Sequence, residues 1–240
     1  MSLHEIRTVD IFGEILHRNY GDKVNELIAR LESIEELALA VDDVCDGVSG
    51  VEVARKLVNS LLNLLNFDRK ILEIISREGE RIFEENAKIH AIAKEIEKAS
   101  SITSILAYLI EGYSARAALA ELYSKLSKAF GFTVDEFEIK NIVAAYFVID
   151  DLRDLDEDLK NGSPNLVVAL SKNTFLNFRM KRVLLEMVFL HFLEEVSDKT
   201  VISGLISTYK TYEEKVFAKK EKKVGDRAGE RAVPLLMSKS

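Results

Sequence analysis

The sequence is short of the residues that cross-link or interrupt a fold. Its 240 residues include one cysteine, Cys45, and two prolines. One cysteine cannot form an internal disulfide or a cysteine-based zinc site, so we expect a reducing compartment, the cytoplasm. Because proline is scarce and Leu, Ile, Ala, Glu and Lys are common, the composition favours helices.

Two further features are missing, an excess of positive charge and a long apolar run. The formal net charge is −7. Binding nucleic acid through its phosphates requires a basic surface, so nucleic acid is not an expected partner. The longest charge-free run, "ASSITSILAYLI" (99–110), is too short to cross a bilayer, and "MSLHEIR" does not resemble a signal peptide. We therefore expect no transmembrane segment.

What the chain does contain is apolar spacing with a period of three to four residues along almost its whole length. No composition typical of a linker divides it. We predict an all-α fold, a single domain over residues 1–240, built as one bundle of about eight to ten helices around a central cavity. A basic tail should begin near residue 222. The helices are predicted at 4–18, 22–46, 50–66, 68–96, 99–130, 135–161, 164–171, 175–196 and 198–223. In "NGSPN" (161–165), Gly162 should end one helix and Ser163 should cap the next.

Two apolar helices end in aspartate clusters, "LALAVDDVCDG" (37–47) and "AAYFVIDDLRDLDED" (144–158). Residues four apart share a helix face. Asp42 and Asp46 therefore continue the apolar face of the first helix, and Asp150, Asp154 and Asp158 continue that of the second. These carboxylates are predicted to face the interior.

The other faces of the second helix follow from the same spacing. Leu152, Leu155 and Leu159 lie opposite the aspartates, where they can pack against neighbouring helices. Arg153 and Lys160 should point to other faces again, away from the aspartates. Near the first cluster the local sequence offers few bases, since Arg55 and Lys56 are the nearest downstream.

Carboxylates on an inward face need protonation, a paired base or a metal ion, because an isolated buried charge is very costly. Mg²⁺ prefers oxygen ligands and is usually bound by one or two carboxylates together with phosphate and water. Two facing clusters could hold several such ions above an apolar cavity. The plainer alternative is that these are surface acids on ordinary amphipathic helices.

Both clusters resemble the aspartate-rich motifs of the class I isoprenoid synthases. Asp42-Asp43-Val44-Cys45-Asp46 is similar to the first motif, and Asp150-Asp151-Leu152-Arg153-Asp154 is similar to the second. The resemblance implies an all-α fold around a cavity, and about three Mg²⁺ ions that hold the diphosphate of an allylic isoprenoid substrate. It implies a prenyltransferase that ionises this diphosphate and couples or rearranges the carbocation.

Carried over by position, the resemblance implies a set of site residues. The metal ligands would be Asp42, Asp46, Asp150, Asp154 and Asp158, and Asp43 and Asp151 complete the candidate catalytic set with Asp42, Asp46, Asp150 and Asp154. The candidate substrate-binding bases are Arg55, Lys98, Arg153, Lys160 and Lys210. The stretch that binds isopentenyl diphosphate in prenyl synthases has no close counterpart, since "YGDKVNE" (20–26) stands in its place.

Several functional alternatives stay open. A head-to-head squalene- or phytoene-type synthase and a terpene cyclase use the same metal chemistry. An all-α nucleotide pyrophosphohydrolase also uses acidic helices, although its acids are usually closely spaced glutamates. A helical protein that kept the fold without the chemistry is a third class, and a homodimer stays open as the oligomeric state. Nucleophilic catalysis by Cys45 is disfavoured because no histidine lies near it in sequence.

Overall fold

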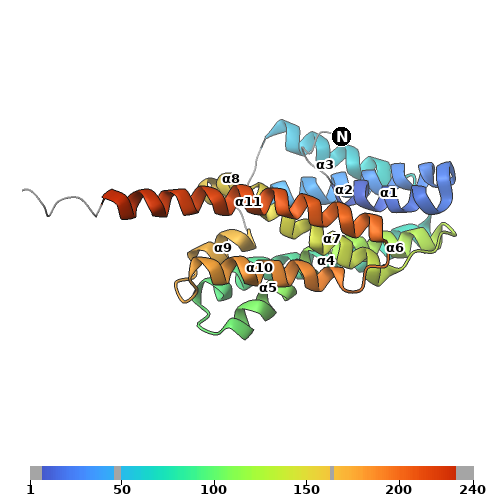
Figure 1. The fold of residues 1–240 in the computed structure, drawn as a ribbon. Helices are drawn as coiled ribbons and strands as arrows, with labels where there is room; N and C mark the ends of the chain where they lie inside the picture. The colour runs from blue at the N-terminus through green and yellow to red at the C-terminus, as the bar shows by residue number, and fades with distance from the viewer. Residues whose placement is uncertain (1–6, 46–49, 163–164, 231–240) are drawn as a thin grey trace, which may run out of the picture. The chain divides into compact units, whose positions relative to one another are not determined.

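The structure is a computed structural model, and it describes residues 7–45, 50–162 and 165–230 (Figure 1). The side chains of Asp42, Asp43, Cys45 and residues 218–230 lie outside the description. Within the described residues the fold is all-helical, as predicted, with α-helices α1 to α11 and one short 3-10 helix, η1. No described helix combines the length and apolar character needed to cross a membrane. The chain divides into two compact units.

Unit 1 comprises Met1–Ile89 and Ser114–Ala144. Its elements are α1 (Thr8–Tyr20), η1 (Gly21–Val24), α2 (Asn25–Cys45), α3 (Val51–Leu64), most of α4 (Arg69–Lys98), α6 (Ala118–Ala129) and the first half of α7 (Glu136–Arg153). Helix α1 packs against α2 and α6, and α2 also packs against α3. The rings of Phe12 and Tyr123 meet edge to face at 5.6 Å between centroids, which joins α1 to α6 in the core.

The start of α1 is held by a buried glutamate from α2. Glu35 accepts hydrogen bonds from the backbone N–H groups of Thr8 at 2.8 Å and Val9 at 2.9 Å. These donors have no partner inside their own helix, so the carboxylate satisfies them. Burial nevertheless raises the pKa of Glu35 above its ordinary value, against the lowering effect of these bonds.

Unit 2 comprises His90–Tyr113 and Ala145–Ser240. It contains the end of α4, most of α5 (Ile102–Arg116), the end of α7, α8 (Leu155–Asn161), α9 (Leu166–Lys172), α10 (Phe178–Leu193) and α11 (Lys199–Glu230). A Cβ added at Gly112 would lie 2.6 Å from Leu166 Cδ1, so the glycine allows α5 and α9 to approach closely. Buried Asn173 donates to the carbonyls of Ile96 and Ala99 and thereby ties the end of α9 to the end of α4.

Two predicted helices are each interrupted once. The predicted helix 99–130 is α5 and α6, separated at Ala117, and the predicted helix 135–161 is α7 and α8, separated at Asp154. Ala117 and Asp154 have ψ angles of 4° and 5°, well away from the helical value of about −42°. Neither position carries a proline or glycine, so the periodic pattern held no signal for the breaks.

The segment after α8 is capped differently from the prediction. Gly162 ends α8 in the left-handed conformation with φ 76°, as predicted. Helix α9, however, begins at Leu166, and its cap is Asn165, which accepts a hydrogen bond from the Val168 N–H at 2.8 Å. The prediction that Ser163 caps this helix is therefore wrong, because a second cap-forming side chain follows two residues later.

Candidate functional site

The first aspartate cluster lies at the end of α2 in unit 1. Asp42 and Asp43 belong to the last turn of this helix, but their side chains are outside the description, and Asp46 lies outside the described residues. Their role as metal ligands, and the cavity that the two clusters were expected to share, therefore stay predictions.

The second cluster is organised around Arg153, the last residue of α7. Its Nε and Nη2 atoms donate to Asp154 Oδ1 at 2.8 Å and Asp154 Oδ2 at 2.7 Å. Nη2 also donates to Asp150 Oδ1, and Nη1 donates to the Tyr146 hydroxyl at 3.2 Å. The prediction that Arg153 points away from the aspartates is wrong. Residues three apart are neighbours on a helix surface, so the long Arg153 side chain can reach Asp150. The helix breaks at Asp154, which brings that carboxylate to the same guanidinium.

These groups are partly shielded from water. The side chains of Asp150 and Asp154 are 20% and 35% exposed, and that of Arg153 is 19% exposed. The hydrogen bonds to Asp154 raise the pKa of Arg153 against the opposing effect of burial, and the charge of Asp150 adds to the rise. Burial and the charge of Asp150 raise the pKa of Tyr146 to about 12. Tyr146 therefore stays protonated and Arg153 stays charged at neutral pH.

Asp151 occupies a different environment from its neighbours. It is 2% exposed, and its Oδ2 atom accepts hydrogen bonds from the Tyr113 hydroxyl at 3.0 Å and the Leu166 N–H at 2.8 Å. These bonds connect α7 to α5 and to the first residue of α9. Asp151 thus lies in the core of unit 2, and its place in the candidate catalytic set stays a prediction.

Asp158 lies on α8, beyond the break, and is half-buried. Its Oδ2 atom accepts a hydrogen bond at 2.8 Å from the amide nitrogen of Asn165, which also donates to the Asp151 carbonyl at 2.9 Å. Sequence reasoning missed Asn165. An asparagine just ahead of an apolar helix was the available signal, but Ser163 offered a competing cap.

The leucine face of this segment is confirmed in part. Leu152 and Leu155 are buried, as predicted, whereas Leu159 is 53% exposed, so its predicted packing is wrong. The break at Asp154 accounts for the difference, because residues beyond it no longer continue the faces of α7.

The other candidate bases are dispersed along the chain. Lys98 is exposed at the end of α4, Lys160 is exposed on α8, and Lys210 is exposed on α11. Arg55 is exposed on α3 and pairs with Glu52 at 3.0 Å. Of the predicted bases, Arg153 is the one that the described structure places against the acids.

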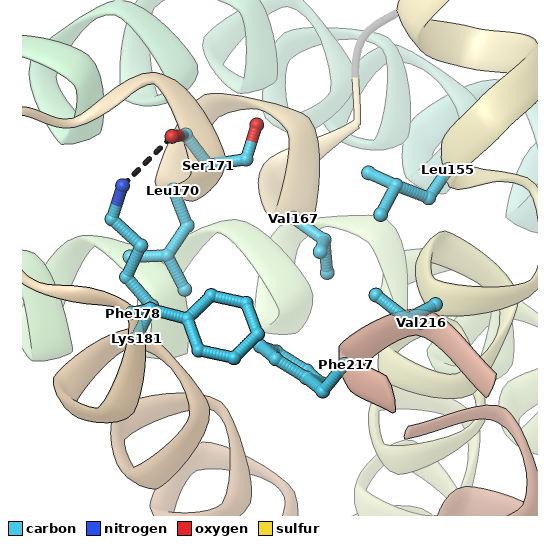
Figure 2. Close-up of a pocket in the computed structure, with 8 residues that line it drawn as sticks. All are labelled: Leu155, Val167, Leu170, Ser171, Phe178, Lys181, Val216 and Phe217. Atoms are coloured by element: carbon cyan, nitrogen blue, oxygen red, sulfur yellow. Dashed lines mark hydrogen bonds between the residues drawn. The ribbon is translucent and has the colours of Figure 1, made fainter. Parts of the chain in front are cut away.

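An apolar pocket of about 200 Å³ lies in unit 2 (Figure 2). It is lined by Leu155, Val167, Leu170, Ser171, Phe178, Lys181, Val216 and Phe217. The rings of Phe178 and Phe217 lie 5.0 Å apart, and Lys181 Nζ donates to the Ser171 carbonyl at 2.7 Å, at the end of α9. Leu155, which directly follows Asp154 in the chain, forms part of its lining.

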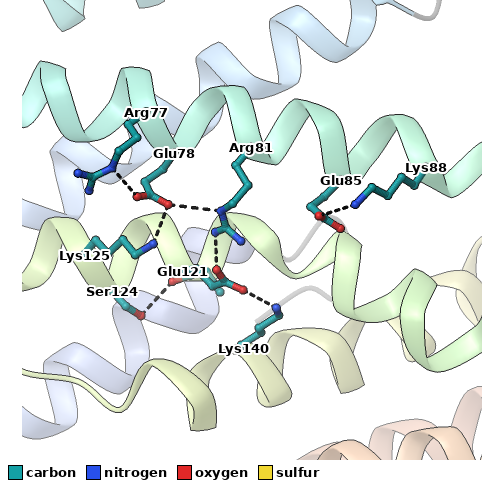
Figure 3. A network of polar contacts seen from close by, with 10 residues as sticks. Arg77, Glu78, Arg81, Glu85, Lys88, Glu121, Ser124, Lys125 and Lys140 are labelled. Atoms are coloured by element: carbon teal, nitrogen blue, oxygen red, sulfur yellow. Dashed lines mark hydrogen bonds and ion pairs between the residues drawn. The ribbon is translucent and has the colours of Figure 1, made fainter. Parts of the chain in front are cut away.

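A second charged cluster lies in unit 1, where α4, α6 and α7 meet (Figure 3). Buried Glu121 pairs with Arg81 and with Lys140. Buried Glu78 pairs with Lys125 at 2.6 Å and with Arg81 at 3.4 Å. Each of these carboxylates is thus matched by at least two bases.

The end of α7 presents carboxylate oxygens, the type of ligand that a hard divalent cation prefers. Among the side chains that the structure describes, no three His, Cys, Asp or Glu residues are grouped around one point. A magnesium site requires only one or two carboxylates, because phosphate and water complete its shell. Asp150 and Asp154 converge on one positive group, the guanidinium of Arg153.

Comparisons with known proteins add no relative, because no family model, curated protein or solved structure matches this chain.

Proposed function

We propose that this chain is a magnesium-dependent enzyme of the class I isoprenoid synthase kind. It ionises an allylic isoprenoid diphosphate and couples or rearranges the resulting carbocation. The observation that carries the proposal is the convergence of Asp150 and Asp154 on one cation at a helix end. The motif resemblance and the all-helical fold support it.

The carboxylates of Asp150 and Asp154 would hold magnesium, with Asp42 and Asp46 as the expected ligands from the first cluster. Magnesium bound there supplies charge neutralisation for the departing diphosphate. Asp158 is held by the Asn165 amide, which leaves it oriented beside the end of α7.

The chain itself supplies a base for the diphosphate and an apolar surface for the hydrocarbon. The planar guanidinium of Arg153 matches phosphate oxygens as well as it matches the carboxylate of Asp154. The Tyr146 hydroxyl holds one edge of that guanidinium. The pocket beside Leu155 has about 200 Å³, less than the roughly 300–1,000 Å³ typical of ligand sites, so it suits part of a hydrocarbon chain.

The direct test is incubation with a series of allylic diphosphates and Mg²⁺, with and without isopentenyl diphosphate. Products are identified by mass spectrometry and released pyrophosphate is measured. Asp150→Ala should lower turnover by about 100-fold or more, the usual effect of removing one group that stabilises developing charge. Asp156→Ala, which alters an exposed aspartate of α8, serves as the matched control and should stay close to wild type.

Binding gives a second measurement that does not depend on finding the right substrate. Mg²⁺ with pyrophosphate should raise the melting temperature of the wild type and of Asp156→Ala, but not that of Asp150→Ala. Hydrolysis of nucleoside triphosphates in place of allylic diphosphates would favour the pyrophosphohydrolase. Absence of both turnover and Mg²⁺-dependent pyrophosphate binding would favour a non-catalytic helical protein.

A further inference from the structure

We infer that Arg153 is an internal counter-cation that occupies the place of the metal in the metal-free protein. It moves to the anionic substrate when metal and anion bind together. The inference rests on the proposed function, because it assigns Asp150 and Asp154 to the metal. It adds a device that makes metal binding depend on the anion.

The geometry places Arg153 in competition with a metal. The guanidinium binds both carboxylate oxygens of Asp154 and the Oδ1 atom of Asp150. Mg²⁺ would coordinate oxygens of these same carboxylates at about 2.0–2.1 Å. Two cations held by the same partly shielded acids repel each other strongly. Metal alone must therefore displace Arg153, and this displacement weakens the apparent affinity of the two aspartates for Mg²⁺.

Displacement by a metal is also unfavourable for Arg153 itself. The Arg153 side chain is 19% exposed, and its described partners are the two carboxylates and the Tyr146 hydroxyl. A largely shielded guanidinium that loses its acids loses strong charge-assisted hydrogen bonds. A diphosphate restores them, since its oxygens accept the same fork of donors. The anion thus removes the penalty that metal alone incurs.

The expected consequence is positive coupling between Mg²⁺ and the anion. If the anion raises the affinity for the metal, the metal must raise the affinity for the anion by the same factor. Arg153 would act as a positioning residue that keeps the acids together before metal arrives and delays metal occupancy until the substrate is present.

The test is calorimetric titration of MgCl₂ into the full chain, with and without inorganic pyrophosphate. We expect Arg153→Gln to bind Mg²⁺ alone about tenfold more tightly than wild type, within the range of known couplings. The gain in Mg²⁺ affinity from pyrophosphate should shrink by about the same factor. Arg179→Gln removes an exposed arginine of α10 in the same unit and should behave as wild type.

Each outcome separates the inference from the proposed function. If Mg²⁺ and pyrophosphate bind but Arg153→Gln binds Mg²⁺ alone no more tightly than wild type, the inference is wrong and the proposed function stands. If no variant binds Mg²⁺ even with pyrophosphate, both are wrong. A merely structural role would weaken binding of metal alone, which is the opposite sign. Circular dichroism melts without ligand check that each variant folds. Arg153→Lys is a second variant, which keeps the positive charge but lacks the forked donors. Its affinity for Mg²⁺ alone should lie between those of wild type and Arg153→Gln.

Discussion

The charged cluster of unit 1 and the acid cluster of unit 2 both contain carboxylates that are at least partly shielded from water, but these carboxylates are paired with bases in different ways. In unit 1, Glu78 and Glu121 are 5% and 8% exposed, and their bases come from other helices as well as their own. In unit 2, Asp150 and Asp154 are more exposed and share Arg153, which lies one to three residues away in the chain.

The difference lies in exposure and in where the bases come from. The two glutamates of unit 1 are bound by Arg77, Arg81, Lys125 and Lys140, which lie on three helices (Figure 3). Asp150 and Asp154 both bind the guanidinium of Arg153 at the end of their own helix. Buried acids bridged by bases of several helices tie those helices together, whereas a more exposed acid pair at a helix end is easier for a cation from solution to reach. This contrast supports the choice of unit 2 for the candidate site.

The largest expected effect tests the structural role of the unit 1 cluster. Glu121→Ala would leave Arg81 and Lys140 without this partner between α4, α6 and α7. We expect the free energy of unfolding to fall by about 3 kcal/mol, the low end for a broken buried pair, since both bases are partly exposed. Urea denaturation measures this. Glu26→Ala, whose pair with Arg30 is exposed, should cost no more than about 0.5 kcal/mol. Equal costs for the two variants would remove the contrast between matched and exposed pairs.

A smaller effect is expected from acid. Burial raises the pKa values of Glu78 and Glu121, but the paired bases outweigh it and lower both below the ordinary 4.5. Because the folded pKa is lowered, this stabilisation is complete above pH 4.5 and is lost as the pH falls through the folded values. The protonated acids still form hydrogen bonds, so the loss is smaller than in Glu121→Ala.

The measurement is the free energy of unfolding between pH 3 and pH 7, in wild type and in Glu121→Gln. The variant should lose less stability on acidification than wild type does, because one of the two titrating groups is gone. Glu35 works in the opposite direction, since its pKa is raised by burial and its protonation at low pH relieves a cost. An identical acid dependence in wild type and Glu121→Gln would contradict the assignment.

The smallest expected effect concerns the neutral donors around Asp151. Tyr113→Phe removes the hydroxyl that donates to its carboxylate and keeps the Leu166 N–H. The free energy of unfolding should fall by about 1–2 kcal/mol, the cost of a lost buried hydrogen bond. Tyr108→Phe, on the same helix, is the control and should change stability less. Thermal and urea unfolding together test the difference, and a loss as large as that of Glu121→Ala would reverse the expected order.

Much of the fold could be predicted because apolar spacing reports helices directly. The all-α class followed from that spacing, and Gly162 marked the end of α8 because only a residue without a Cβ adopts its conformation easily. The breaks at Ala117 and Asp154 could not be predicted. Both are ordinary residues whose backbone departs from a helix, and a local apolar pattern does not record such a departure.

The candidate site was predictable in its acids and not in its base. The four-residue spacing of Asp150 and Asp154 predicted that their carboxylates share one face of the helix. Arg153 was assigned to another face because an ideal helix separates adjacent residues by about 100°. A flexible arginine at a helix end can reach across that angle, so its partner depends on side-chain conformation and on the break that follows.

The sequence by itself determined the helices and the two acidic helix ends, because helical period and residue type act over a few neighbouring positions. Tertiary structure decided which carboxylates are buried, which base each one meets, and that Asp151 belongs to the core while Asp150 and Asp154 face a shared cation. Those choices depend on residues far apart in the chain, or on rotamers selected by packing, and neither is written in a local pattern.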